Sequence, residues 1–318
     1  MINPVSFKGY SVLNNSSVKR RANSNPQYSQ LTNVYIFKCQ QKVFFENGTK
    51  NVKIKQRQLI DCQLLAFIDA LCHNKNGVKI MEKMLQLSPD GKTIYVYFAN
   101  SKDPITLDFE ATKKDYDRKN AYNKIPSLRF RNFINGIKEY IKTGNKDYLK
   151  FNPSIGDFGI YALEQAYAKF LDSNLYSTGG ENAVINNNDY HGDGYICMKD
   201  IIGGTIEAIR TAESMKQNSK NDIPLNSIPY EEKEKINKLL KNVSQNPDKY
   251  VVTASTIVSK DKNFVKKFVQ WHDYSIRKVD YGTKKLTIVN PWDNSKQKVI
   301  TFDELMENFE GIVYAQVG

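Results

Sequence analysis

The sequence predicts an α+β protein in which a mainly helical part precedes a part built from antiparallel strands. Apolar residues recur at helical spacing in several segments of the first part, whereas apolar and polar residues alternate in most segments after residue 250. A polar segment with two prolines, NSKNDIPLNSIP, separates the two patterns. We therefore expect one subdomain at 34–215 and a second at 216–318. Residues 1–33 are rich in Asn, Ser, Gln and Lys, which predicts a disordered N-terminal arm.

The main element expected in the first part is an apolar helix that begins at or just after Cys62, with Asp61 as its N-cap. Turn residues followed by alternating apolar residues predict strands within 88–99 and 103–110. Further short strands are expected at 33–39 and 42–47, and further helices at about 128–142, 156–172 and 201–215.

The second part is expected to open with a helix near 230–243 and to close with a short helix at 301–309 and a strand at 311–317. Between them, alternating patterns predict strands at 250–258, 272–280 and 285–290. The turn DYGT joins the last two strands, and Gly282 can adopt the positive φ that a tight hairpin turn needs. This order predicts an antiparallel sheet that faces the helical part across a cleft.

The net charge of +12 invites a nucleic-acid interpretation, but the lysines are spread along the chain and mixed with acidic residues. No nucleic-acid-binding motif accompanies the short basic patches, so we expect a solvated basic surface. The sequence has no run of about 18 apolar residues and no secretory signal pattern at its N-terminus. We expect a monomer that binds neither nucleic acid nor membrane, and that is cytoplasmic or exported without a Sec signal.

The four cysteines, at positions 39, 62, 72 and 197, form no CxxC pair, which argues against structural zinc. They are also too few for a disulfide framework, so reduced thiols are expected. Cys62 stands in the segment QRQLIDCQLLAFIDALC, where apolar residues repeat at helical spacing. It is either one more buried apolar residue or a thiol at the first turn of the helix, where the dipole favours a thiolate.

A hairpin argument singles out His272 and Asn290. Alternate residues of a strand share one face, and pairing of Val279 with Lys284 would place His272 within one residue of facing Asn290. Pro291 then ends the strand, because proline cannot donate to the ladder. The predicted result is an imidazole beside a carboxamide at the open end of the hairpin.

These residues could support thiol catalysis. The thiolate of Cys62 would attack, the imidazole of His272 would return a proton to the leaving amine, and the amide of Asn290 would hold the ring in one tautomer. A glutamine upstream of the cysteine, Gln56 or Gln58, would face the developing oxyanion together with a backbone N–H. Each residue also has an ordinary structural interpretation, and the residues alone leave catalysis and core packing open.

The chain resembles the calpain family of cysteine proteases in six motifs that follow the family's order. QRQLIDCQLLA is similar to the nucleophile motif, which runs Gln, four residues and then Gly-Asp-Cys-Trp-Leu-Leu-Ala. WHDYSI is similar to Gly-His-Ala-Tyr-Ser, and NPWD to Asn-Pro-Trp-Gly. LEQAYAKF at 163–170, DIIGGTIE at 200–207 and the closing TFDELMENFEGIVYAQV resemble further family segments, so the resemblance spans roughly residues 35–318.

The resemblance implies a papain-like fold and hydrolysis of peptide bonds through an acyl-enzyme. Cys62 would be the nucleophile and His272 the general acid and base. Asn290 would orient the imidazole, and Gln56 would donate a hydrogen bond to the oxyanion. Trp292 would shield the His–Asn pair from water, and the substrate cleft would be lined by Trp271, Gly179 and Gly180. The implied partners are protein or peptide substrates. The alternative is a catalytically silent relative that binds peptides or proteins.

Four positions near the expected site depart from the family pattern, so the family's substrate preference does not carry over. They are Ile60, Gln63, Trp271 and Asp273. Asp273 and Asp61 could also change the balance between thiolate and imidazolium.

No cofactor is expected to be required, although one loop invites a calcium interpretation. In DYHGDGYICMKD, positions 1, 5, 6 and 12 of an EF-hand loop are held by Asp189, Asp193, Gly194 and Asp200. Position 3 is a histidine and Asp is short for position 12, so we favour a polar loop near the cleft. The resemblance to animal calpains also implies an acidic calcium ligand nine residues before the cysteine, but this chain has Lys53 there.

Overall fold

The computed structural model of the chain describes residues 41–56, 61–122, 135, 137–146, 156–171, 194–210, 230–259 and 261–318. Several expectations fall outside these residues, namely the arm at 1–33, the strand at 33–39, Gln58, Ile60, Gly179, Gly180, Asp189 and Asp193. Most of the described helices precede an antiparallel sheet along the chain, which confirms the α+β class.

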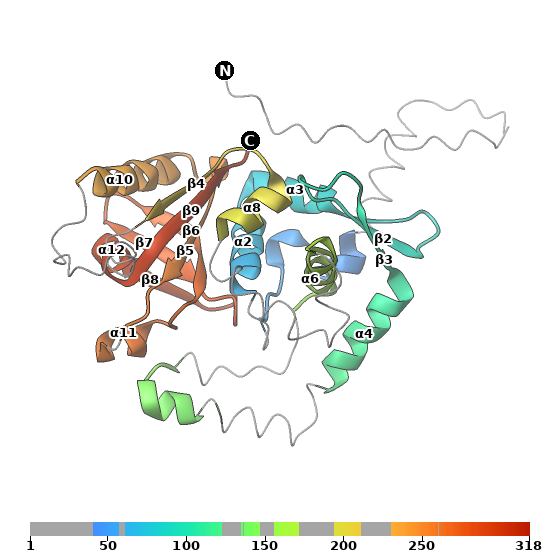
Figure 1. The fold of residues 1–318 in the computed structure, drawn as a ribbon, viewed down its shortest axis with the longest axis horizontal. Coiled ribbons are helices and arrows are strands. Elements are labelled where there is room, and N and C mark those ends of the chain that lie inside the picture. Colours follow the sequence, from blue (N-terminus) through green and yellow to red (C-terminus); the bar gives the residue numbers. More distant parts are fainter. Residues whose placement is uncertain are drawn as a thin grey trace.

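Five strands of the second part and one strand of the first part, β4, form a six-stranded antiparallel sheet with the strand order β4-β9-β5-β6-β7-β8 (Figure 1). The strands are β4 (Ile206–Arg210), β5 (Tyr250–Thr256), β6 (Asp273–Asp280), β7 (Lys285–Val289), β8 (Gln297–Thr301) and β9 (Phe309–Gln316). The strands predicted at 250–258, 272–280, 285–290 and 311–317 are confirmed as β5, β6, β7 and β9. β4 and β8 are further strands that the sequence patterns do not predict.

The first part surrounds one central helix, α2 (Cys62–Cys72), in which ten of the eleven residues are buried. Further helices of the first part are α3 (Lys75–Met84), α4 (Phe109–Tyr122), α6 (Phe158–Phe170) and α8 (Gly194–Ile202). Residues 41–44 are also helical, as are the described residues of the helix expected at about 128–142. A small antiparallel sheet holds β1 (Leu85–Leu87), β2 (Thr93–Val96) and β3 (Ile105–Asp108), and η1 (Thr49–Asn51) is a single 3-10 turn. The predicted helices at 62 and 156–172 and the strands within 88–99 and 103–110 are confirmed.

The six-stranded sheet is covered on both faces, and α2 lies against one of them (Figure 1). Because strand side chains alternate, Val251 packs into the core around α2, whereas Val252 and Ala254 pack into a second core. The second core is closed by α10 (Tyr230–Gln245), α11 (Lys262–Lys267) and α12 (Phe302–Asn308). A 3-10 turn, η4 (Pro247–Lys249), leads from α10 into β5. The sheet therefore lies between the two cores and contributes side chains to both.

Two predicted elements are wrong. Residues 42–47, expected as a strand, are helical as far as residue 44 and then turn. Phe44 and Phe45 are both buried in the first core, whereas a strand would direct them to opposite faces. Residues 201–215 do not form one helix, because α8 ends at Ile202 and β4 follows. Gly203 and Gly204 separate the two with φ values of 63° and 77°, which glycine adopts without steric cost.

Candidate active site

His272 and Asn290 are joined at the open end of the β6–β7 hairpin. His272 precedes β6, Asn290 follows β7, and His272 Nε2 lies 2.8 Å from Asn290 Oδ1. The predicted pairing of an imidazole with a carboxamide is thus confirmed. The predicted register is wrong by two residues, because Val279 pairs with Leu286 rather than with Lys284. The positive φ of the turn, expected at Gly282, occurs instead at Lys284, with a value of 54°.

A bulge accounts for the pairing despite the different register. The ladder, continued to the open end, sets Tyr274 opposite Asn290 and leaves His272 in the diagonal position, which is still within side-chain reach. The register shifts by one residue at Arg277. Without that shift, Asn290 would point to the other face of the sheet. The bulge therefore brings the carboxamide to the His272 side.

The hydrogen bonds of Asn290 identify the tautomer of His272. The backbone N–H of Trp292 donates to Asn290 Oδ1 at 2.8 Å, so this atom is the amide oxygen. An oxygen can only accept, and His272 Nε2 therefore carries the hydrogen of their shared bond. Nδ1 is then the basic nitrogen of the neutral ring.

Two aromatic rings hold the imidazole in place. The ring of Trp292 lies 5.1 Å from the His272 ring between centroids, in a tilted arrangement. Tyr274 makes an edge-to-face contact at 5.3 Å, and its hydroxyl accepts the N–H of Val269 at 3.0 Å. His272 is only 4% exposed. Trp292 therefore lies against the imidazole, at the position where the family resemblance places the shielding residue.

Cys62 is the first residue of α2, and its thiol is directed at the start of β6. Its Sγ lies 3.5 Å from Oδ2 of Asp273, the residue after His272, and 3.6 Å from Oε1 of Gln63. Asp273 is buried, and its other oxygen accepts the hydroxyl of Ser255. The helix that carries the candidate nucleophile and the strand that follows the candidate base therefore meet at this contact.

The surroundings of Cys62 favour the protonated thiol. Burial raises the pKa of Cys62 well above the usual value of a thiol, and the negative charges of Asp273 and Asp61 raise it further. The sequence pattern left the direction of this effect open. The two negative charges therefore act in the same direction, against the thiolate, whereas a hydrogen bond to the backbone of Asp273 lowers the pKa.

Gln56 lies beside the same helix tip. Its backbone N–H donates to Pro291 O at 2.9 Å, and its side-chain Nε2 donates to Asp61 Oδ1 at 3.0 Å. Asp61 occupies the predicted N-cap position, but its side chain makes no capping hydrogen bond to α2. The carboxamide of Gln56 is therefore hydrogen-bonded to the N-cap residue of the Cys62 helix.

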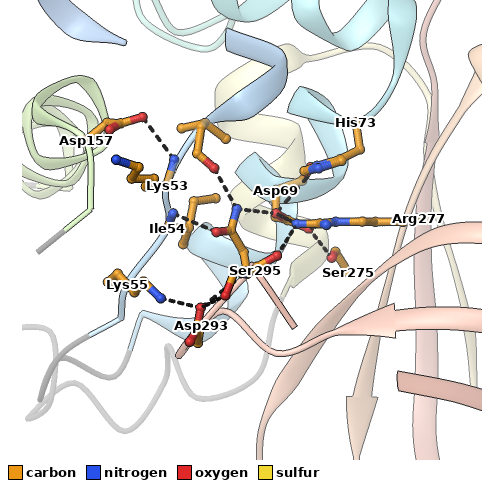
Figure 2. Close-up of polar contacts among 12 residues, drawn as sticks. Lys53, Ile54, Lys55, Asp69, His73, Asp157, Ser275, Arg277, Asp293 and Ser295 are labelled. Atoms are coloured by element: carbon orange, nitrogen blue, oxygen red, sulfur yellow. Dashed lines mark hydrogen bonds and ion pairs between the residues drawn. The ribbon is translucent and has the colours of Figure 1, made fainter. Parts of the chain in front are cut away.

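A buried polar network lies two helical turns behind Cys62, centred on Asp69 (Figure 2). Arg277 binds both carboxylate oxygens of Asp69, through Nε at 2.9 Å and Nη2 at 2.6 Å. The hydroxyl of Ser275 also donates to Asp69, and His73 Nδ1 lies 2.8 Å from the Asp69 backbone oxygen. This network, hereafter the Asp69 network, fastens α2 to β6.

Asn294 extends the Asp69 network to the loop after β7 and to residues 52–56. Its Nδ2 donates to Asp69 Oδ1 and to Val52 O, both at 2.9 Å, and its Oδ1 accepts the N–H of Ile54 at 3.0 Å. Lys55 and Asp293 form an ion pair alongside (Figure 2). The four segments that carry Gln56, Cys62, His272 and Asn290 are therefore held together by one set of buried bonds.

The sequence patterns did not identify the Asp69 network. One signal was present, because Asp69 is a charged residue within an otherwise apolar helical run, seven residues after Cys62. An acid at that position is buried only when it has partners. Its partners Arg277 and Asn294 lie 208 and 225 residues further along the chain, so no local pattern reveals them.

Among the residues that the structure describes, no group of three or more His, Cys, Asp or Glu side chains could hold a metal ion. Asp200, one of the calcium candidates, lies in α8 and accepts hydrogen bonds from Asn100 at 3.1 Å and Tyr167 at 3.3 Å. Cys62, Cys72 and Cys197 are free thiols.

Neither a scan of protein-family models nor a search of curated proteins finds a match to this chain. Within the described ranges, no helix is both long and apolar enough to cross a membrane.

Proposed function

We propose that this chain is a cysteine endopeptidase of the calpain-like, papain-like type, with Cys62 as nucleophile and His272 as general base and acid. The observation that carries the proposal is the hydrogen bond between His272 and Asn290, next to the contact between the Cys62 thiol and the start of β6. A thiol nucleophile needs a nearby imidazole whose tautomer is fixed by a third group. The substrates are peptide bonds of unstructured protein segments.

The proposed reaction proceeds through a thioester. Nδ1 of His272 takes the thiol proton while Sγ of Cys62 bonds to the carbonyl carbon. The C–N bond then breaks, and the imidazolium gives its proton to the leaving amine. In the second half-reaction, His272 takes a proton from water as the water oxygen attacks the thioester. The carboxylic acid leaves, and the returned proton restores the thiol. Gln56 and the backbone N–H of Cys62 stabilise the oxyanion of each step.

The raised pKa of Cys62 favours transfer of the thiol proton during the attack on the substrate. A resting thiolate beside an imidazolium is disfavoured by burial and by the carboxylate of Asp273. His272 therefore removes the proton during the attack, as a general base does for a serine nucleophile, rather than before the substrate binds.

The deciding test is hydrolysis of casein by the wild type and by Cys62→Ala. We expect cleavage by the wild type and only background cleavage by Cys62→Ala and His272→Ala, because each variant removes one partner of the proton transfer. Cys72→Ala is the matched control, since Cys72 is a buried thiol in the same helix and is expected to leave cleavage unchanged. Equal cleavage by the wild type and Cys62→Ala would contradict the assignment of Cys62 as the nucleophile.

A catalytically silent relative that binds peptides or proteins is the second candidate. The observation that favours it is the contact between the Cys62 thiol and the Asp273 carboxylate, because this contact opposes the thiolate. Alkylation of Cys62 by iodoacetamide separates the candidates. In the protease the imidazole assists the loss of the thiol proton, so His272→Ala slows alkylation; in the silent relative the rate does not depend on His272.

A further inference from the structure

Trp271, the residue before His272, combines an unfavourable backbone with an exposed side chain. Its φ is 47°, and its side chain is 68% exposed. Across the described part of the chain, Lys284 is the one other residue besides glycine with a positive φ, of 54°. Lys284 ends the tight β6–β7 turn, and its ammonium lies 3.5 Å from the centre of the Tyr281 ring. The turn accounts for Lys284, whereas Trp271 lies outside any hairpin turn.

The bonds of Thr256 impose this backbone on Trp271. Thr256 is fully buried; its Oγ1 accepts the N–H of His272 at 3.0 Å, and its backbone N–H donates to His272 O at 3.0 Å. The Thr256 hydroxyl also donates to Val269 O at 2.7 Å. Both ends of the segment 269–272 are thus fastened to β5. A glycine would adopt the left-handed conformation in between without cost, whereas the Cβ of tryptophan makes it strained.

We propose that Trp271 is a substrate-binding residue that receives an apolar side chain of the peptide next to the bond to be cleaved. A left-handed backbone at a tryptophan costs the fold free energy, and backbone outliers of this kind concentrate at functional sites. An exposed indole offers a large and rigid apolar surface, which suits the recognition of apolar or aromatic side chains. The inference rests on the proposed function and adds the class of side chain that the site selects.

Tryptophan resonances provide a direct test, because the chain has only two tryptophans, Trp271 and Trp292. The full chain carrying Cys62→Ala and nitrogen-15-labelled tryptophan binds peptide without cleaving it, and Trp271→Phe assigns the two indole signals. Two twelve-residue Gly–Ser peptides are titrated, one with a single central Phe and one with Gly in its place. We expect the Phe peptide to move the Trp271 signal and to bind at least about tenfold more tightly than the Gly peptide.

Trp271→Gly and Trp271→Ala separate binding from strain in the same background. Both remove the indole, so both are expected to lose the tenfold preference for the Phe peptide, measured by calorimetry. Only glycine relieves the strain, so the Gly variant is expected to melt about 2–4 °C above the Ala variant. Equal melting temperatures, or a preference that survives in both variants, would overturn the proposal.

The casein assay and the peptide titration test the two proposals separately. If the wild type does not cleave casein while the Phe peptide still moves the Trp271 signal, the protease assignment is wrong and the binding role of Trp271 stands. If casein is cleaved in a Cys62-dependent way while the Trp271 signal does not move, the role proposed for Trp271 alone is wrong.

Discussion

Asp69 and Asp273 are two buried carboxylates that this protein uses in different ways. They are 1% and 3% exposed; Asp273 is the first residue of β6, and Asp69 accepts the hydroxyl of Ser275 in the same strand. Asp69 binds the guanidinium of Arg277 through both oxygens, whereas Asp273 contacts the hydroxyl of Ser255 and the thiol of Cys62. One carboxylate is matched to a permanent cation, and the other lies beside a group whose chemistry depends on its proton. The partner, not the burial, distinguishes a structural acid from one that acts on the site.

The comparison also separates stability from reactivity. A buried ion pair is not necessarily worth more than apolar residues of the same shape, but removing one partner leaves an uncompensated charge. Removing one partner from the Asp69 network is therefore expected to lower the free energy of unfolding. Asp273 is expected to matter for the proton of Cys62, because a negative charge near a thiol disfavours the thiolate.

Arg277→Met is expected to have the largest effect, a loss of about 3–5 kcal/mol in the free energy of unfolding. The methionine fills much of the space but leaves the Asp69 carboxylate buried without its cation. Urea denaturation measures the change. Asp69→Leu combined with Arg277→Met removes both charges and is expected to lose less than Arg277→Met alone. A single-variant loss below about 1 kcal/mol would contradict the structural role of the network.

Asn294→Ala is expected to cost about 1–3 kcal/mol, because it leaves the backbone groups of Val52 and Ile54 without their partner. The same denaturation measurement applies. Asn51→Ala is the matched control: its amide makes an exposed bond to Asn47 O, so a change within about 0.5 kcal/mol is expected. Equal losses in the two variants would mean that burial of the Asn294 bonds is not what stabilises the loop.

Most elements of the second part were predictable, β8 excepted, because their signals are local. Alternating residues marked β6 and β7, the segment DYGT marked their turn, and Pro291 marked the end of the second strand. The pairing of His272 with Asn290 followed from these signals. The bulge at Arg277 sets the actual register of the β6–β7 hairpin, and the alternation of apolar and polar residues does not reveal it. A classic bulge needs only one extra residue near the right-handed helical conformation, which most residue types can adopt.

The contacts that bring distant segments together were not predictable from local patterns. The thiol of Cys62 meets Asp273 across 211 residues of sequence, and β4 joins β9 by pairing Ile206 with Ala315. The resemblance placed Cys62 and His272 in one site but gave no direction for the proton balance. That direction depends on burial and on the distance between two charges, which only the folded arrangement supplies.

Asp273→Asn is expected to increase the alkylation rate of Cys62 at pH 7.5 by about tenfold, an effect equivalent to about 1.4 kcal/mol. Removal of the negative charge lowers the pKa of the thiol, so the rate profile moves toward lower pH. Peptide mapping after reaction with iodoacetamide measures Cys62 separately from the buried thiols of Cys72 and Cys197.

Asp61→Asn is the matched control for this prediction. Asp61 raises the pKa of Cys62 by a smaller amount than Asp273 does, so the expected acceleration is smaller. An unchanged rate in Asp273→Asn would show that burial alone keeps the thiol protonated. Asp273 would then have no effect on the reactivity of Cys62, and its proposed difference from Asp69 would be wrong.

The smallest expected effect belongs to an ion pair at the surface. Lys113 and Asp117 lie four residues apart in α4 with Nζ 2.6 Å from Oδ1, and their side chains are 37% and 56% exposed. Asp117→Asn is expected to change the free energy of unfolding by no more than about 0.5 kcal/mol, because water screens the pair in the folded state. This change is expected to vanish in 1 M salt, whereas the loss in Arg277→Met persists, because ions cannot reach Asp69. If both variants responded to salt alike, charge rather than burial would explain the stability of the Asp69 network.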